Sequence, residues 1–134
     1  MLSPKSAQNL NGVHKDLARV VTLAAVRTKI PFAVTEGCRA LAREQHLIET
    51  GFSSLKDPRR CRHVPTTDGV GHAVDLAPLD NNGVPTWSHI EAFTPIAQAM
   101  KSAAAELKIP LEWGGDWKTF KDYSHFQLPW KQYP

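Results

Sequence analysis

Three residues of types that bind metal ions are spread along the 134-residue sequence: His63, Asp75 and His125. Asp75 stands between Val74 and Leu76 in a run with strand-like alternation. Successive side chains of a strand point to opposite faces, so if Val74 and Leu76 face a core, Asp75 projects from the other face. The alternation therefore predicts that the Asp75 carboxylate is available for chemistry.

The same alternation applies to His125, which is followed by Phe126 and Leu128 as candidate core residues. Together with His63, which lies in a long loop before Asp75, the set offers two imidazoles and one carboxylate. Such a set is typical of catalytic zinc sites, which leave a fourth position for water. However, an isolated His or Asp at a strand end is more often a hydrogen-bonding or surface residue, and no compact H-E-x-x-H motif is present. Spacing alone leaves both interpretations open.

Motifs around these residues resemble those of a known family. C-R-H at 61–63 followed by G-H-A-V-D at 71–75 resembles the S-x-H-x-x-G-x-A-x-D pattern of the D-alanyl-D-alanine carboxypeptidase (VanY-like) zinc metallopeptidases. W-G-G-D-W at 113–117 with D-Y-S-H at 122–125 resembles that family's closing motif, and T-E-G-C-R at 35–39 is similar to its arginine segment. In order and spacing, the chain resembles the L-alanyl-D-glutamate peptidase endolysins of bacteriophages.

The resemblance implies a role for each of five residues. His63, Asp75 and His125 are expected to hold one Zn²⁺ per chain, and Asp122 to be the catalytic carboxylate. Arg39 is expected to bind a substrate carboxylate or the developing oxyanion. The implied reaction is hydrolysis of the L-alanyl-D-glutamate bond in the peptidoglycan stem peptide, which lyses the bacterial host. A D-alanyl-D-alanine carboxypeptidase on the same scaffold and a catalytically inactive wall-binding module are the alternatives.

The sequence departs from the family pattern at two points. Residues 64–70 make the link between His63 and Gly71 longer than in the pattern. Because an insertion in a surface loop costs little closure entropy, we expect His63 still to reach the metal. His72, the rival ligand, precedes Asp75 by three residues and would point away from it on a strand, so it is left outside the set. Cys61 stands where serine is usual, which places a thiol close to the expected metal.

The elements that must position these residues follow from apolar periodicity. Three- and four-residue steps predict a helix over about residues 13–28, along a stripe of Val13, Leu17, Val20, Val21 and Ala24. Pro31 ends it, a short strand follows from Phe32 to about Gly37, and a second helix is expected over 40–49, closed by Gly51.

The second half of the chain predicts one more helix and several strands. A strand over 72–79 is expected to turn through 80–83 into a hairpin partner at 84–87. Ser88 and Glu91 have the spacing of a capping box that begins the next helix, which Pro95 must bend or restart. Two further short strands are expected at 111–113 and 125–128.

These elements predict an α+β fold in which two or three helices pack on a small antiparallel sheet. The resemblance makes this fold hedgehog/D,D-peptidase-like. We expect residues 1–134 to form a single zinc peptidase catalytic domain without a separate cell-wall-binding domain.

Composition and charge limit the function classes. The net charge is +3, with a basic group at Lys56, Arg59, Arg60 and Arg62. These residues either form an ordinary solvated basic surface or weakly attract an anionic polymer. Nucleic-acid binding is not supported, because no aromatic residues are interleaved with the basic ones. Cys38 and Cys61 are expected to be free structural thiols.

The sequence also predicts where the chain works. No apolar run approaches the roughly 20 residues of a membrane helix, and the first residues lack the features of a secretory signal. We therefore expect a monomer that stays in the host cytoplasm until a separate pore-forming lysis protein releases it to the wall.

Overall fold

The computed structural model describes residues 1–51 and 61–134, apart from the side chain of Leu41. Three residues of the basic group, Lys56, Arg59 and Arg60, lie outside the described residues. Within the described part, no helix combines the length and the apolar character that crossing a membrane requires.

The centre of the fold is an antiparallel sheet of four strands in the order β1-β2-β4-β3. The strands are β1 (Phe32–Glu36), β2 (Ala73–Pro78), β3 (Glu112–Trp113) and β4 (His125–Gln127). β2 and β4 occupy the middle, with Asp75 directly opposite His125 in their register. The two strand residues expected to bind metal are thus neighbours across the central strand pair.

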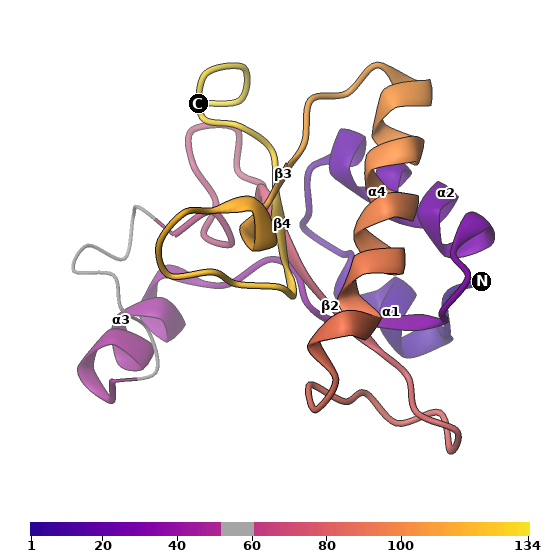
Figure 1. Cartoon of the computed structure of the whole chain (residues 1–134). Helices are drawn as coiled ribbons and strands as arrows, with labels where there is room; N and C mark the ends of the chain where they lie inside the picture. The colour runs from indigo at the N-terminus through magenta and orange to yellow at the C-terminus, as the bar shows by residue number, and fades with distance from the viewer. Residues whose placement is uncertain (52–60) are drawn as a thin grey trace.

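Four α-helices accompany the sheet in the described residues. They are α1 (Pro4–Asn9), α2 (Lys15–Arg27), α3 (Leu41–Glu49) and α4 (Phe93–Leu107). α2 and α4 pack against each other and cover one side of the sheet, whereas α3 lies on the opposite side of the molecule, beyond the site-bearing strands (Figure 1). The α+β fold with helices on a small antiparallel sheet is therefore confirmed.

The core lies between the sheet and the α2–α4 pair. The predicted stripe of α2 is buried along its whole length, as are Val74, Leu76, Phe126 and Leu128 on the central strands. Burial of each large apolar side chain contributes about 1.5–3 kcal/mol to stability. This packing fixes which face of β2 and β4 points away from the core, and hence where Asp75 and His125 project.

Two local predictions were wrong. The expected hairpin strand at 84–87 is reduced to a single bridge between Leu79 and Pro85, because proline has no N–H to continue a ladder. The capping box does not form either: α4 begins at Phe93 after a short 3₁₀ turn, η2 (Ile90–Ala92), and no side-chain cap precedes it. Pro95 is accommodated in the first turn of α4, where its missing N–H costs nothing.

Candidate metal centre

The structure brings His63, Asp75 and His125 together, although they are far apart in sequence. One potential ligand atom from each residue lies within 4.8 Å of the others. Asp75 Oδ1 is 3.4 Å from His63 Nε2 and 3.4 Å from His125 Nδ1. Asp75 and His125 come from facing positions of β2 and β4, whereas His63 comes from the segment before β2.

His63 is held by the backbone around it. Its Nδ1 lies 2.8 Å from the Gly37 carbonyl oxygen, and its own carbonyl accepts a hydrogen bond from the Arg39 N–H at 2.7 Å. A Cβ atom at Gly37 would lie 2.1 Å from the Asn9 carbonyl oxygen, so only glycine fits at this end of β1. With Nδ1 donating to Gly37, the Nε2 lone pair faces Asp75 despite the longer link at 64–70.

The geometry of the three ligand atoms fits a tetrahedral cation. Ligand atoms bound to zinc at about 2.0–2.1 Å lie about 3.3–3.4 Å apart when the coordination is tetrahedral. Asp75 Oδ1 matches this spacing to both histidines. The same oxygen is buried and has no hydrogen-bond partner among the described residues. A buried carboxylate oxygen of this kind is costly unless it binds a cation, so the donor set fits Zn²⁺.

The electrostatics of the group favour an anionic Asp75. Burial by itself would raise the pKa of Asp75, but the nearby His125 and His63 hold that pKa well below its usual range. Burial would likewise lower the pKa of His125, yet the Asp75 carboxylate raises it. Asp75 is therefore a carboxylate at neutral pH, as a cation ligand must be.

Asp122 is positioned by the turn that leads into β4. Its backbone N–H donates to the Gly114 carbonyl at 3.1 Å, and its own carbonyl accepts from the His125 N–H at 3.2 Å. The exposed Asp122 carboxylate accepts a hydrogen bond from the Ser124 hydroxyl at 3.1 Å. Its negative charge also contributes to raising the pKa of His125. The fold thus places a second carboxylate at the same end of β4 as the group of His63, Asp75 and His125.

Arg39 is engaged by two carboxylates. Its Nε donates to Glu36 Oε1 at 2.8 Å, and its Nη1 donates to Glu44 Oε2 at 2.6 Å. Burial would lower the pKa of Arg39, but these glutamates raise it. Cys61 lies 3.5 Å from Arg39 Nη1 and is buried, and burial raises the pKa of its thiol to about 11. Cys61 is therefore a neutral thiol, and both cysteines are free.

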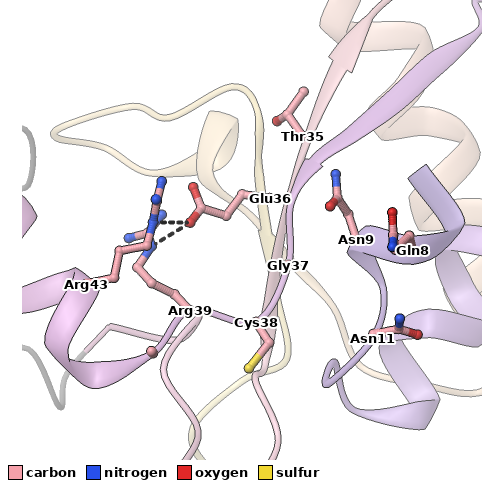
Figure 2. A pocket seen from close by; sticks show the side chains of 10 residues that line it. Gln8, Asn9, Asn11, Thr35, Glu36, Gly37, Cys38, Arg39 and Arg43 are labelled. Carbon is pink, nitrogen blue, oxygen red and sulfur yellow. Dashed lines mark hydrogen bonds and ion pairs between the residues drawn. The ribbon is translucent and has the colours of Figure 1, made fainter. Parts of the chain in front are cut away.

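A polar pocket of about 380 Å³ borders this arginine. Glu36, Arg39 and Arg43 lie on one side of the 36–38 segment, and the amides of Gln8, Asn9 and Asn11 lie on the other (Figure 2). Glu36 pairs with Asp75 in the sheet register, and the neighbouring Gly37 carbonyl faces His63. The pocket therefore shares part of its wall with the backbone that supports His63 in the candidate metal centre.

His72, the rival ligand, lies outside this group. Its Nε2 makes a direct 2.7 Å hydrogen bond to Asp68 Oδ2, and its ring is fully buried. Among the described residues, the cluster of possible ligand atoms consists of His63, Asp75 and His125, and His72 contributes none.

Sequence reasoning missed the partners that orient His125. Its Nε2 lies 2.8 Å from Gln127 Oε1, and Gln127 Nε2 donates to Glu112 Oε1 at 2.9 Å. The Trp117 ring also packs on the His125 ring, with their centroids 5.3 Å apart. The two-residue spacing of His125 and Gln127 on one strand face was the available signal.

Comparisons with known proteins identify the family of the chain. Residues 1–127 match the family described as phage L-alanyl-D-glutamate peptidase. The chain is 33% identical over 118 residues to the L-alanyl-D-glutamate peptidase of Escherichia phage T5, covering 88% of this chain and 82% of that protein. It is 27% identical over 123 residues to the Bacillus subtilis (strain 168) peptidoglycan L-alanyl-D-glutamate endopeptidase CwlK, covering 90% and 74% respectively.

A solved structure is similar over nearly the whole fold. The Serratia marcescens L-Ala D-Glu endopeptidase ChiX superposes with a TM-score of 0.85 at 41% sequence identity. The match covers 100% of this chain and 94% of that chain. The sheet and the helices that position the candidate metal centre are thus shared with a solved enzyme.

Proposed function

The chain belongs to the family of phage L-alanyl-D-glutamate peptidases, and we propose that it hydrolyses the L-alanyl-D-glutamate bond of peptidoglycan with one bound Zn²⁺. The observation that supports the zinc proposal most strongly is the buried Asp75 Oδ1. It lies 3.4 Å from one ring nitrogen of each histidine and has no hydrogen-bond partner in residues 1–51 and 61–134. The enzyme is a peptidase and peptidoglycan hydrolase by its family.

His63, Asp75 and His125 are the residues that would hold the ion. Zinc bound to such a set lowers the pKa of its water to about 7 and polarises a carbonyl group. The chain supplies the orientation: the Gly37 carbonyl fixes the His63 ring, and Gln127 fixes the His125 ring. Both rings thereby direct a lone pair at the same point.

Asp122 acts as the general base in this proposal. It lies three residues before His125, and the turn that joins them is tied to Gly114. Its carboxylate takes a proton from the attacking water and returns it to the leaving amine of D-glutamate. Removal of such a base typically lowers the rate by about 10²–10⁴-fold.

Arg39 and the adjoining polar pocket are proposed to bind the stem peptide. The planar guanidinium suits a carboxylate such as that of D-glutamate. Glu36 and Glu44 hold the Nε and Nη1 atoms of Arg39 and so fix the plane of the group. The exposed Arg43, beside Glu36, adds a second positive charge to the same pocket.

We further propose that residues 1–134 act as one catalytic domain and as a monomer. On this view the enzyme accumulates in the host cytoplasm and reaches the wall when a separate pore-forming protein opens the membrane. The family membership supports this route, because a phage peptidase that is made inside the host must cross the membrane to reach its peptidoglycan substrate.

Digestion of purified peptidoglycan tests the proposed bond. Mass spectrometry of the products is expected to reveal stem peptides with a new amino-terminal D-glutamate, and the Asp75→Asn variant is expected to release none. Free D-alanine as the sole product would instead identify a carboxypeptidase. Binding to the wall without any product would identify an inactive wall-binding module.

A further inference from the structure

A row of polar side chains crosses the sheet on the face away from the core. Asp75 on β2 stands opposite His125 on β4, and Gln127 on β4 stands opposite Glu112 on β3. His125 and Gln127 are two residues apart, so they project from the same face of β4. The register alone therefore places these four side chains next to one another in one line.

Hydrogen bonds join this row from its outer end inward. Gln127 Nε2 donates to Glu112 Oε1 at 2.9 Å, and Gln127 Oε1 lies 2.8 Å from His125 Nε2. Gln127 is buried, whereas Glu112 is exposed at the edge of the sheet. The amide of Gln127 thus connects a solvent-facing carboxylate with a buried imidazole.

The chemistry of these groups fixes the direction of each bond. An ionised carboxylate can only accept, so the amide nitrogen of Gln127 must face Glu112 and its oxygen must face His125. That oxygen is also only an acceptor, so His125 Nε2 must carry a hydrogen. In a neutral imidazole, Nδ1 then has the lone pair, and Nδ1 is the atom 3.4 Å from Asp75 Oδ1.

We infer that Glu112 and Gln127 are positioning residues that set the His125 tautomer required for metal binding. The negative charge of Glu112 orients the amide, and the amide selects the Nε2–H form. The inference rests on the proposed metal centre. Partners of this kind typically change metal affinity by about 10–100-fold when they are lost.

Reversing the charge at residue 112 should reverse the orientation of the Gln127 amide and change the tautomer of His125. In Glu112→Lys, an ammonium group donates to the amide oxygen of Gln127, so the amide nitrogen faces His125 and favours the Nδ1–H tautomer. Glu112 is exposed on an edge strand, so this variant is expected to fold.

A second substitution is expected to restore the original tautomer. In the double variant Glu112→Lys with Gln127→Glu, the introduced carboxylate can only accept hydrogen bonds. One of its oxygens pairs with the introduced ammonium group, and the other accepts from His125 Nε2–H. The double variant therefore keeps the reversed charge at the sheet edge and regains the acceptor that the imidazole requires.

Two readouts test the inference. ¹⁵N NMR of the imidazole in metal-free protein above pH 8 should show Nε2–H for wild type and the double variant, and Nδ1–H for Glu112→Lys. Chelator competition should show zinc affinity weakened by about 10–100-fold in Glu112→Lys and largely recovered in the double variant. Glu112→Gln, which conserves size and removes only the charge, should lie between wild type and Glu112→Lys.

Asp116→Lys is the charge-matched control, since Asp116 is an exposed carboxylate paired with Lys101 and makes no contact with Gln127 among the described residues. The inference is overturned if Glu112→Lys retains the Nε2–H tautomer, or if it loses no more zinc affinity than Asp116→Lys. Failure of wild type to bind zinc would overturn the metal centre instead, and the tautomer of the metal-free protein would still decide the role of Glu112 and Gln127.

Discussion

Two histidine–aspartate groups of the structure differ in geometry. In the His72–Asp68 pair, the ring nitrogen and the carboxylate oxygen are 2.7 Å apart. In the group of His63, Asp75 and His125, the corresponding distances are both 3.4 Å. All three histidines are buried, but the Asp68 side chain is 40% exposed against 22% for that of Asp75.

The difference indicates what each group is built to do. A separation of 2.7 Å is a direct hydrogen bond, which satisfies His72 Nε2 and Asp68 Oδ2. The other ring nitrogen, His72 Nδ1, is buried without a hydrogen-bond partner among the described residues. At 3.4 Å from two ring nitrogens, Asp75 Oδ1 has no hydrogen bond in the part of the chain that the structure describes. The outer nitrogens of the two rings are held by Gly37 and Gln127. Two imidazole lone pairs that converge on one point, on rings whose other nitrogens are hydrogen-bonded, suit the binding of a cation. A direct histidine–aspartate hydrogen bond suits a structural role.

The same substitution at the two aspartates gives the largest expected contrast. Asp75→Asn removes the anionic ligand, and we expect loss of bound zinc and hydrolysis of purified wall at background level. Asp68→Asn keeps the size of its side chain and should retain both zinc and activity. Metal analysis together with the release of soluble wall fragments measures the contrast. Equal zinc content in the two variants would contradict the assignment of Asp75.

A substitution at Asp122 separates metal binding from chemistry. Asp122→Asn should retain zinc, since Asp122 is not among the clustered ligands, and should lower the rate of wall hydrolysis by about 10²–10⁴-fold. Ser124→Ala, which removes only the hydroxyl that donates to Asp122, serves as the matched control and should cost far less. Full activity in Asp122→Asn would show that another group is the base.

A substitution at His72 should affect stability and leave the metal in place. His72→Gln removes a fully buried ring and its bond to Asp68, which should lower the free energy of unfolding by about 1–3 kcal/mol. Chemical denaturation of the metal-free protein measures this loss. Zinc stoichiometry should stay the same as in wild type, and a loss of zinc would place His72 among the ligands.

The smallest expected effect is a pH dependence of the free energy of unfolding that comes from His72. Burial lowers the pKa of His72, despite the hydrogen bond to Asp68 that raises it. The unfolded chain, with a histidine pKa of about 6.5, therefore takes up the proton first. This contribution to stability is complete above about pH 6.5 and is lost as the pH falls from there toward the lower folded-state pKa.

The matching measurement compares metal-free wild type with His72→Gln between pH 8 and pH 5. The stability advantage of wild type should shrink as the pH falls below about 6.5. Titration of His63 and His125 is common to both proteins and cancels in the difference. A constant difference across this range would contradict a neutral, buried His72.

The parts of the fold that could be predicted are those in which apolar residues recur with the period of a helix or a strand. The apolar stripe of α2 and the alternation around Val74 and Phe126 predicted which faces are buried. They also predicted that Asp75 and His125 project from the other face. The association of His63 with them came from motif resemblance, because nothing in its own loop is periodic.

Other features depend on contacts that no local pattern encodes. α1 has only six residues, too few to establish a helical period, and it is stabilised by contact with β1. The link between Gln127 and Glu112 exists only because β3 pairs with β4 in one register. The absent capping box shows that Ser88 and Glu91 have the right spacing but lie before a 3₁₀ turn rather than at the start of α4.

Metal content measured together with activity tests the central claim most directly. We expect about one zinc ion per purified chain, loss of wall hydrolysis when a chelator removes it, and recovery when zinc is added back. Undiminished hydrolysis by protein stripped of zinc would contradict the metal centre of His63, Asp75 and His125.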